Sequence, residues 1–140
     1  MAHIAPFPHH YTVSLADGLV TAPSHPPIPV GPPPQFGGTD TVWSPEDLLV
    51  AATLECLWTT FNAYLRHEGI QADFSGRATG VLDKGPTGPR FTSIDLDVKL
   101  VAATTDIEKA RSLLLKAEKH CIISNALSAP VHLNVSVQEH

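Results

Sequence analysis

The first 65 residues contain no lysine and no arginine. They hold five acidic residues, whereas residues 66–140 hold nine acidic and nine basic residues. The whole net charge of −5 therefore belongs to the first half of the chain. Proteins that bind nucleic acids or anionic membranes use clusters of lysine and arginine, and this sequence has no such cluster. We therefore expect neither a nucleic acid nor a membrane among its partners.

Cysteine is also scarce, with only Cys56 and Cys121. Two cysteines are too few for a secreted disulfide scaffold or a zinc ribbon, and no Cys/His spacing predicts a metal site. The N-terminus lacks the basic and apolar segments of a secretory signal. The longest apolar run, residues 48–65, contains Glu55 and Asn62, which favours a buried helix over a membrane span. We expect a cytoplasmic protein without a metal or a cofactor.

A chain of 140 residues with 43% hydrophobic and 16% charged residues has the composition of one globular domain. We expect this domain to span residues 1–140. It would consist of strands and a proline-rich connection (1–43), a central helix (44–68), and a hairpin, a helix and a closing strand (69–140).

Proline dominates the first part, where residues 1–34 hold nine of the 13 prolines. Asp17-Gly18 predicts a hairpin turn between strands at 10–15 and 19–22. Residues 24–38 contain too much proline and glycine for a helix or a central strand. They are expected to form an extended connection.

The central helix has clear start and stop signals. Ser44 suits the N-cap, Pro45 the first helical position and Asp47 the end of a capping box, while Gly69 suits the C-terminal stop. Between residues 48 and 65 only Glu55 is charged. A helix that is apolar all round must be buried on nearly every side, and one sheet covers only one side. We infer that a second copy of the chain covers the rest.

The rest of the sequence alternates between the two-residue period of strands and the 3.6-residue period of helices. Strands are predicted at 74–82 and 90–101, joined by a loop at 84–89, and a closing strand at 131–137. In the second strand, the apolar residues Ile94, Leu96, Val98 and Leu100 are expected to face one way. An amphipathic helix is predicted at 105–120, starting with a capping box of Thr105 and Glu108. This order indicates an α+β fold in which an antiparallel sheet packs against two main helices on one face.

The two cysteines occupy different helical positions. Cys56 lies in the middle of the central helix among small residues, and Cys121 ends the second helix. If a short helix begins directly after Cys121, its free N–H groups would lower the pKa of this thiol. The alternative is that both are structural core thiols, because free cysteine is among the most buried residue types.

Two separated motifs carry a family resemblance. The segment WSPEDLLVAATLEC at residues 43–56, followed by HCIISNAL at residues 120–127, resembles the OsmC/Ohr family of osmotically induced and organic hydroperoxide resistance proteins. The resemblance covers essentially the whole chain. It implies the OsmC-like fold, an intertwined homodimer, and a peroxiredoxin-like thiol peroxidase with an antioxidant role in the stress response.

The same resemblance implies a role for each of three residues. Cys56 would be the peroxidatic thiolate that attacks an organic hydroperoxide and becomes a sulfenic acid. Cys121 would condense with it to a disulfide, which a dithiol such as dihydrolipoamide reduces. Glu46 falls on the family's glutamate, which holds an arginine near the reactive cysteine. Since ten helical residues span about 15 Å, Glu46 would act through a bridging side chain or on the other subunit's cysteine.

The N-terminal arginine of the family is missing here. Ala16 stands near its position in the Ohr-like register, and Gln35 does so in the OsmC-like register. The side chains that remain as replacement cations are His9, His10, His25, Arg66 and Arg77. Two other functions therefore stay open: a non-peroxidatic dimer that binds an apolar small molecule, and a redox sensor whose disulfide changes the dimer without turnover.

Overall fold

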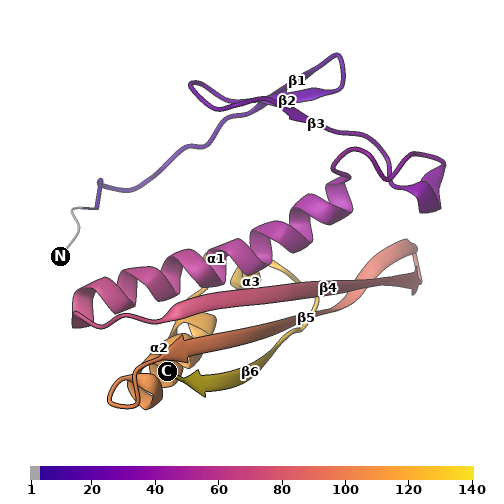
Figure 1. Ribbon diagram of the computed structural model, residues 1–140. Coiled ribbons are helices and arrows are strands. Elements are labelled where there is room, and N and C mark those ends of the chain that lie inside the picture. The colour runs from indigo at the N-terminus through magenta and orange to yellow at the C-terminus, as the bar shows by residue number, and fades with distance from the viewer. Residues whose placement is uncertain (1–3) are drawn as a thin grey trace. The chain divides into compact units, whose positions relative to one another are not determined.

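A computed structural model describes residues 4–140 (Figure 1). The chain forms two compact units, residues 1–48 and 49–140, and each is described by itself. The elements follow in this order: β1 (Ser14–Ala16), β2 (Leu19–Thr21), β3 (Ile28–Pro29), the 3₁₀ helix η1 (Pro34–Phe36), α1 (Pro45–Glu68), β4 (Asp73–Gly85), β5 (Gly88–Ala102), α2 (Ile107–Lys119), α3 (Ile122–Ala126) and β6 (Val131–Glu139).

The N-terminal unit contains a small antiparallel sheet in the order β1-β2-β3. Asp17 and Gly18 form the predicted hairpin turn, with φ values of 52° and 72°, as a two-residue hairpin requires. The expectation of a purely extended connection after this hairpin was wrong, because the connection contains β3 and η1. Proline is compatible with both, since β3 is an edge strand and proline fits the first turn of a helix.

The start of α1 confirms the predicted capping box. The Asp47 N–H donates to Ser44 Oγ at 3.0 Å, and the Ser44 N–H donates to Asp47 Oδ2 at 3.2 Å. The helix runs to Glu68, and Gly69 follows with a φ of 68°. This left-handed conformation favours glycine and ends the helix.

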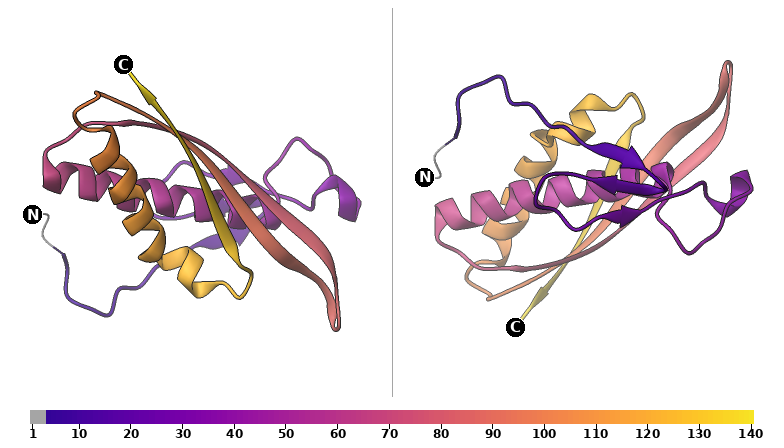
Figure 2. Two further views of the ribbon diagram at one scale, coloured as in Figure 1. Left: turned by 90° about the horizontal axis from the view of Figure 1, so that it is seen from below. Right: turned by 90° about the horizontal axis from the view of Figure 1, so that it is seen from above.

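The C-terminal unit is built on the sheet β4-β5-β6. The long hairpin of β4 and β5 is antiparallel, as expected, but β5 and β6 pair in parallel. The expected antiparallel sheet is therefore a mixed sheet. The helices α2 and α3 carry the chain back from the end of β5 to the start of β6 (Figure 2), which is the type of crossover that a parallel pair needs.

The core of this unit lies between both main helices and one face of β5. The alternating residues Ile94, Leu96, Val98 and Leu100 are all buried, as the sequence predicted. They pack in one cluster with residues of α1 and α2, namely Leu57, Phe61, Leu65, Ile107, Ala110, Leu113, Leu114 and Ala117. The α+β class with two main helices is thereby confirmed.

Two glycines of β4 let α1 approach the sheet closely. A Cβ atom at Gly80 would lie 2.7 Å from Val50 Cγ2, and one at Gly76 would lie 3.2 Å from Leu54 Cδ1. Real Cβ atoms essentially never come as close as the first of these distances. Glycine on β4 therefore sets the distance between helix and strand, and so the position of Cys56 above the sheet.

The start of α2 differs from the expectation. The capping box of Thr105 and Glu108 is absent: Asp106 is the N-cap residue and makes no side-chain cap hydrogen bond. Instead, the N–H groups of Asp106 and Ile107 both donate to the Ala103 carbonyl, at 2.9 and 3.0 Å. A backbone turn thus satisfies donors that a side chain would otherwise cap.

Only a narrow stripe of α1 is buried within one copy of the chain. The buried residues are Thr53, Leu57, Phe61 and Leu65, one per turn, whereas Trp58 is 45% exposed. By length and composition alone α1 would suffice to cross a membrane, and 22% of its most apolar 18-residue window is buried. The sheet and α2 of the C-terminal unit therefore bury one side of this helix, and its coverage by a second copy stays a prediction.

Candidate functional site

Cys56 lies in the middle of α1, facing the interior of the C-terminal unit. It is half-buried and packs against the core cluster. Its own carbonyl accepts a hydrogen bond from Thr59 Oγ1 at 3.1 Å. Because Cys56 is far from the first turn of the helix, no free backbone N–H is available to stabilise a thiolate there.

Cys121 occupies the corner between α2 and α3 and is fully buried. Its carbonyl accepts the Asn125 N–H at 3.0 Å, and the Asn125 side-chain Nδ2 donates to the Lys119 carbonyl at 3.2 Å. Asn125 therefore closes the end of α2 and the start of α3 together. The Cys-x-x-Ser-Asn segment thus fixes the backbone that carries this thiol.

The fold brings the two thiols together although 65 positions separate them in the chain. The Cys56 and Thr60 side chains lie close enough to Cys121 to shift the pKa of its thiol, and Cys56 packs against the core cluster that contains Cys121. Thr60 follows Cys56 by one helical turn, so both face the same corner. The sequence placed Thr60 near Cys56 by this spacing but gave no sign of its contact with Cys121.

Burial raises the pKa of the Cys121 thiol from 9.0 to about 12. The charge on Cys56, the hydrogen bond with Cys56 and the charge on Glu118 act in the same direction, and the Thr60 hydrogen bond opposes them. The expected short helix does begin at Ile122, directly after Cys121. The expectation that it lowers the pKa of this thiol was wrong, because burial outweighs the few free N–H groups of so short a helix. Cys121 therefore keeps its proton at neutral pH.

This raised pKa predicts a loss of stability in alkali. Between pH 9 and about 12 the folded chain holds the Cys121 proton and the unfolded chain releases it. The free energy of unfolding therefore falls as pH rises, by up to about 1.4 kcal/mol per pH unit for this one proton. We expect the stability advantage of wild type over Cys121→Ala, measured by urea unfolding of reduced protein, to shrink across this range. A stability difference between the two proteins that stays constant from pH 9 to about 12 would contradict the prediction.

Glu46 belongs to the N-terminal unit, where it lines a cavity of about 680 Å³ formed only by residues of that unit. Its Oε1 atom is buried without a hydrogen-bond partner. Ser124 Oγ, three residues after Cys121, is buried in the same way. The structure therefore joins two of the three predicted site residues and places the third among the residues of the other unit.

The side chains considered as replacements for the family's arginine make other contacts or are exposed. His9 Nε2 lies 2.8 Å from the Ala5 carbonyl, and His25 Nδ1 lies 2.6 Å from the Pro23 carbonyl. Arg66 and Arg77 are exposed. Within residues 4–140, no ion pair or hydrogen bond joins a Lys, Arg or His side chain to Cys56 in this single copy. The same described residues contain no group of three His, Cys, Asp or Glu side chains that would hold a metal ion.

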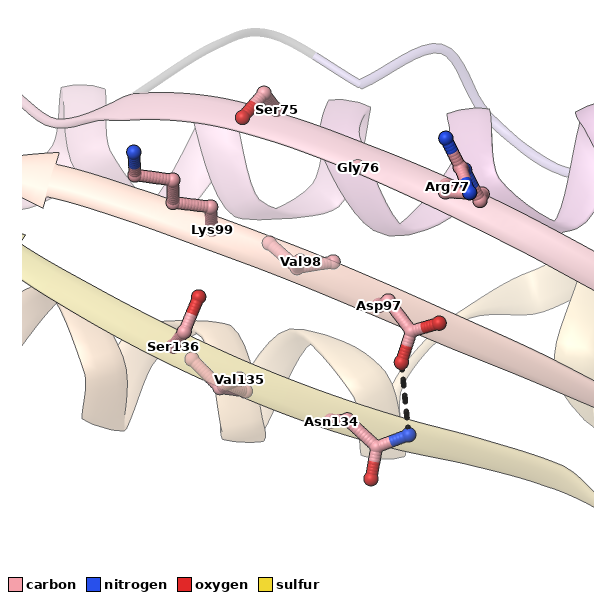
Figure 3. Close-up of a pocket in the computed structure, with 9 residues that line it drawn as sticks. All are labelled: Ser75, Gly76, Arg77, Asp97, Val98, Lys99, Asn134, Val135 and Ser136. Atoms are coloured by element: carbon pink, nitrogen blue, oxygen red, sulfur yellow. Dashed lines mark hydrogen bonds between the residues drawn. The ribbon is translucent and has the colours of Figure 1, made fainter.

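Arg77 lies on the outer face of the sheet, in a shallow hollow of about 450 Å³ (Figure 3). Lys99 shares this hollow, and Asn134 Nδ2 donates to Asp97 Oδ1 at 2.9 Å across β5 and β6. Residues at odd positions of β4 alternate with Gly76 and Gly80, which face α1. Arg77 therefore points away from the cysteines of its own unit.

Solved structures with a fold similar to that of this chain include OsmC-like and organic hydroperoxide resistance proteins. At a TM-score of 0.76 it is similar to an OsmC-like protein of unknown function from Vibrio cholerae, with 18% identity over 84% of this chain and 82% of that one. An organic hydroperoxide resistance protein from Elizabethkingia anophelis gives a TM-score of 0.71, with 20% identity over 94% and 99%. The organic hydroperoxide resistance protein OsmC from Legionella pneumophila gives 0.70, with 22% identity over 91% and 97%.

Sequence comparison identifies the same family independently. No curated protein sequence matches the chain. The sequence model of the family described as OsmC-like protein, however, matches residues 38–136, which include Glu46, Cys56 and Cys121. The matched segment is well over half of the chain, and its fold is that of the solved OsmC-like structures. The chain therefore belongs to the OsmC-like protein family.

Proposed function

We propose that the protein is a thiol-dependent peroxidase that reduces organic hydroperoxides through Cys56 and Cys121. The observation that carries this proposal is the contact between a half-buried thiol and a fully buried, protonated one. A peroxide must reach the attacking sulfur, whereas the second sulfur only has to meet the oxidised first one. Membership of the OsmC-like family and the likeness to two organic hydroperoxide resistance proteins support it.

The chemistry divides into three balanced steps. The Cys56 thiolate attacks one peroxide oxygen, the O–O bond breaks, and the alkoxide leaving group takes up a proton to give an alcohol, leaving a sulfenic acid on Cys56. The Cys121 thiol then displaces hydroxide from this sulfur, giving a disulfide and water. A dithiol such as dihydrolipoamide reduces the disulfide by two exchange reactions and becomes a disulfide itself.

The raised pKa of Cys121 supports the division of roles in this proposal. Only a thiolate is a good nucleophile, and Cys121 keeps its proton at neutral pH. This disfavours Cys121 as the attacking sulfur and supports Cys56 in that role. The protonated Cys121 thiol could also donate a hydrogen bond to a Cys56 thiolate until the sulfenic acid forms. The family register adds Glu46 to the proposed site, as a residue that orients a cation.

The working form in this proposal is an intertwined homodimer in the cytoplasm. Both units expose large apolar side chains that one copy leaves in water, among them Leu15 at 67%, Trp43 at 50% and Trp58 at 45%. A three-stranded sheet as small as β1-β2-β3 also needs a covered face to be stable. A second copy would bury these residues. A monomer found by light scattering would contradict this part of the proposal.

The test uses the reduced wild-type protein and cumene hydroperoxide. One equivalent should remove both free thiols, lower the protein mass by two hydrogen atoms, and link the peptides that contain Cys56 and Cys121. Dihydrolipoamide should restore both thiols and sustain peroxide loss over many cycles, while protein alkylated at both thiols should give none. Intact thiols and stable peroxide would favour the small-molecule-binding alternative. A disulfide without repeated turnover would favour the redox sensor.

A further inference from the structure

Within the described residues, Thr60 is the only threonine of α1 whose hydroxyl makes no hydrogen bond to a carbonyl of its own helix. The Thr53 hydroxyl donates to the Leu49 carbonyl at 2.8 Å, and the Thr59 hydroxyl donates to the Cys56 carbonyl at 3.1 Å. Such a bond to the preceding turn is the ordinary use of a threonine hydroxyl inside a helix. The Thr60 hydroxyl is therefore available to an acceptor outside its own helix.

The packing of α1 against α2 places Thr60 beside the two thiols. Cys56, Thr60 and Tyr64 follow one another at intervals of four residues, so they share one face of α1. Tyr64 on this face contacts α2, because its ring centroid lies 4.8 Å from Lys116 Nζ. Cys56 and Tyr64 both pack against the core cluster that contains Cys121. Thr60 lies between these two contacts, close enough to Cys121 to shift the pKa of its thiol.

Among the groups that shift the pKa of the Cys121 thiol, Thr60 alone lowers it. Burial, the Cys56 sulfur and the Glu118 carboxylate all raise it. A hydrogen bond lowers the pKa of an acid when it is donated to the charged form. The Thr60 hydroxyl therefore favours the thiolate by acting as a donor toward it.

Negative charge develops on the Cys121 sulfur in two steps of the proposed cycle. When the disulfide forms, this sulfur gives up its proton and bonds to the Cys56 sulfur, and the hydroxide that leaves the sulfenic acid takes up a proton to become water. When a dithiol reduces the disulfide, a dithiol thiolate bonds to the Cys56 sulfur and the sulfur–sulfur bond breaks. The Cys121 sulfur then leaves with the electron pair and afterwards takes up a proton.

The second step makes the greater demand on the protein. The dithiol reaches the Cys56 sulfur, because Cys56 is half-buried and Cys121 is fully buried. The leaving group is therefore the Cys121 thiolate, and a thiolate whose thiol has a high pKa leaves slowly. Cys121 is the N-cap residue of α3, but its side chain makes no cap hydrogen bond. The Glu118 carboxylate has the wrong charge to help.

We propose that Thr60 is a further catalytic residue of the thiol cycle, whose hydroxyl donates a hydrogen bond to the Cys121 sulfur while that sulfur carries negative charge. This role rests on the proposed function, because both steps belong to that cycle. The hydroxyl speeds disulfide formation and disulfide reduction alike, since the same sulfur carries the charge in both.

The test measures the reduction step without any peroxide. Diamide oxidises the two thiols of the wild type to the disulfide, and mass spectrometry of the peptides confirms the link between Cys56 and Cys121. Excess dithiothreitol at neutral pH then reduces the disulfide, and the appearance of free thiols gives the rate. Thr60→Val keeps the shape of the side chain without its hydroxyl, so it should slow the reduction about 10-fold or more, as the loss of a hydrogen bond to a charged group implies.

Three further variants separate the hydroxyl from packing. Thr60→Ser keeps the hydroxyl and should reduce within about threefold of the wild-type rate, although serine fills the space less well than valine. Thr60→Ala should be as slow as Thr60→Val, and it tests the same hydroxyl if the valine variant unfolds, because alanine favours a helix. The matched control is Thr79→Val, the same change at an exposed position of β4, which should leave the rate within about twofold.

A second measurement follows the step in which the disulfide forms. With stepwise cumene hydroperoxide, Cys56 of Thr60→Val should become a sulfinic acid at a lower peroxide excess than in wild type, because the sulfenic acid persists for longer. Reduction of Thr60→Val at the wild-type rate would overturn the proposal. Equal slowing in Thr60→Ser, or failure of diamide to link the two thiols, would do the same.

The two measurements also distinguish this proposal from the peroxidase function. If the wild type does not react with the hydroperoxide but its diamide-formed disulfide still needs the Thr60 hydroxyl for rapid reduction, the peroxidase function fails and the hydrogen bond to Cys121 stands. If the wild type cycles with the hydroperoxide and Thr60→Val cycles equally fast, only the role of Thr60 fails.

Discussion

Replacing Cys56 with serine is expected to lower hydroperoxide turnover by at least about 1,000-fold. The hydroxyl of serine has a far higher pKa than a thiol and no polarisable sulfur, so it cannot attack the O–O bond. The measurement is cumene hydroperoxide loss with dihydrolipoamide in excess. The expected mass spectrum after peroxide treatment is that of the unmodified chain, because the remaining Cys121 is buried and protonated.

A matched control separates chemistry from folding. His67→Ser introduces the same hydroxyl at an exposed position in the last turn of the same helix, beyond its apolar run, and it should leave the rate within about twofold, as surface substitutions generally do for stability. Both variants should unfold in one transition near that of wild type. Turnover that survives Cys56→Ser would show that the attacking sulfur is assigned to the wrong residue.

Replacing Cys121 with serine is expected to separate the first chemical step from the cycle. Cys56 should still consume one equivalent of peroxide, but no intramolecular disulfide can form. With excess peroxide the Cys56 sulfur should then gain a second oxygen and become a sulfinic acid, which thiols do not reduce. Steady-state turnover should fall by about 10-fold or more, since each overoxidised chain leaves the cycle.

The experiment follows the protein mass as peroxide is increased stepwise. Wild type should lose two hydrogen atoms and then stay unchanged, while Cys121→Ser should gain one oxygen and then two. The added oxygen should lie in the peptide that contains Cys56. If Cys121→Ser cycles at the wild-type rate without overoxidation, Cys121 is not the resolving thiol, and its contact with Cys56 is structural.

Local signals predicted some element boundaries, such as those of α1. They missed others, because β4 extends to Gly85 and β5 begins at Gly88, where a loop was expected at 84–89. Ser44, Asp47 and Gly69 predicted both ends of α1, because capping bonds and a left-handed C-terminal residue form between near neighbours. Alternation from Ile94 to Leu100 predicted the buried face of β5 for a similar reason. The capping box predicted for Thr105 and Glu108 does not form, because α2 has Asp106 at its N-cap and the Ala103 carbonyl accepts the N–H groups of Asp106 and Ile107.

Local signals could not predict that β6 runs parallel to β5. Its residues Val131, Leu133 and Val135 alternate in the same way in a parallel as in an antiparallel pair, so periodicity identified a strand and not its orientation. The path of α2 and α3 decided the orientation. The family resemblance proposed the pairing of Cys56 with Cys121, and only the folded chain shows their contact.

The sequence by itself determined the family, the α+β class and the identity of the two thiols, because these depend on residue types and on short-range spacing. The tertiary structure alone decided the protonation of Cys121 and the missing partner of Glu46. Both depend on which atoms exclude water from a group, and solvent exclusion is set by segments distant in the chain.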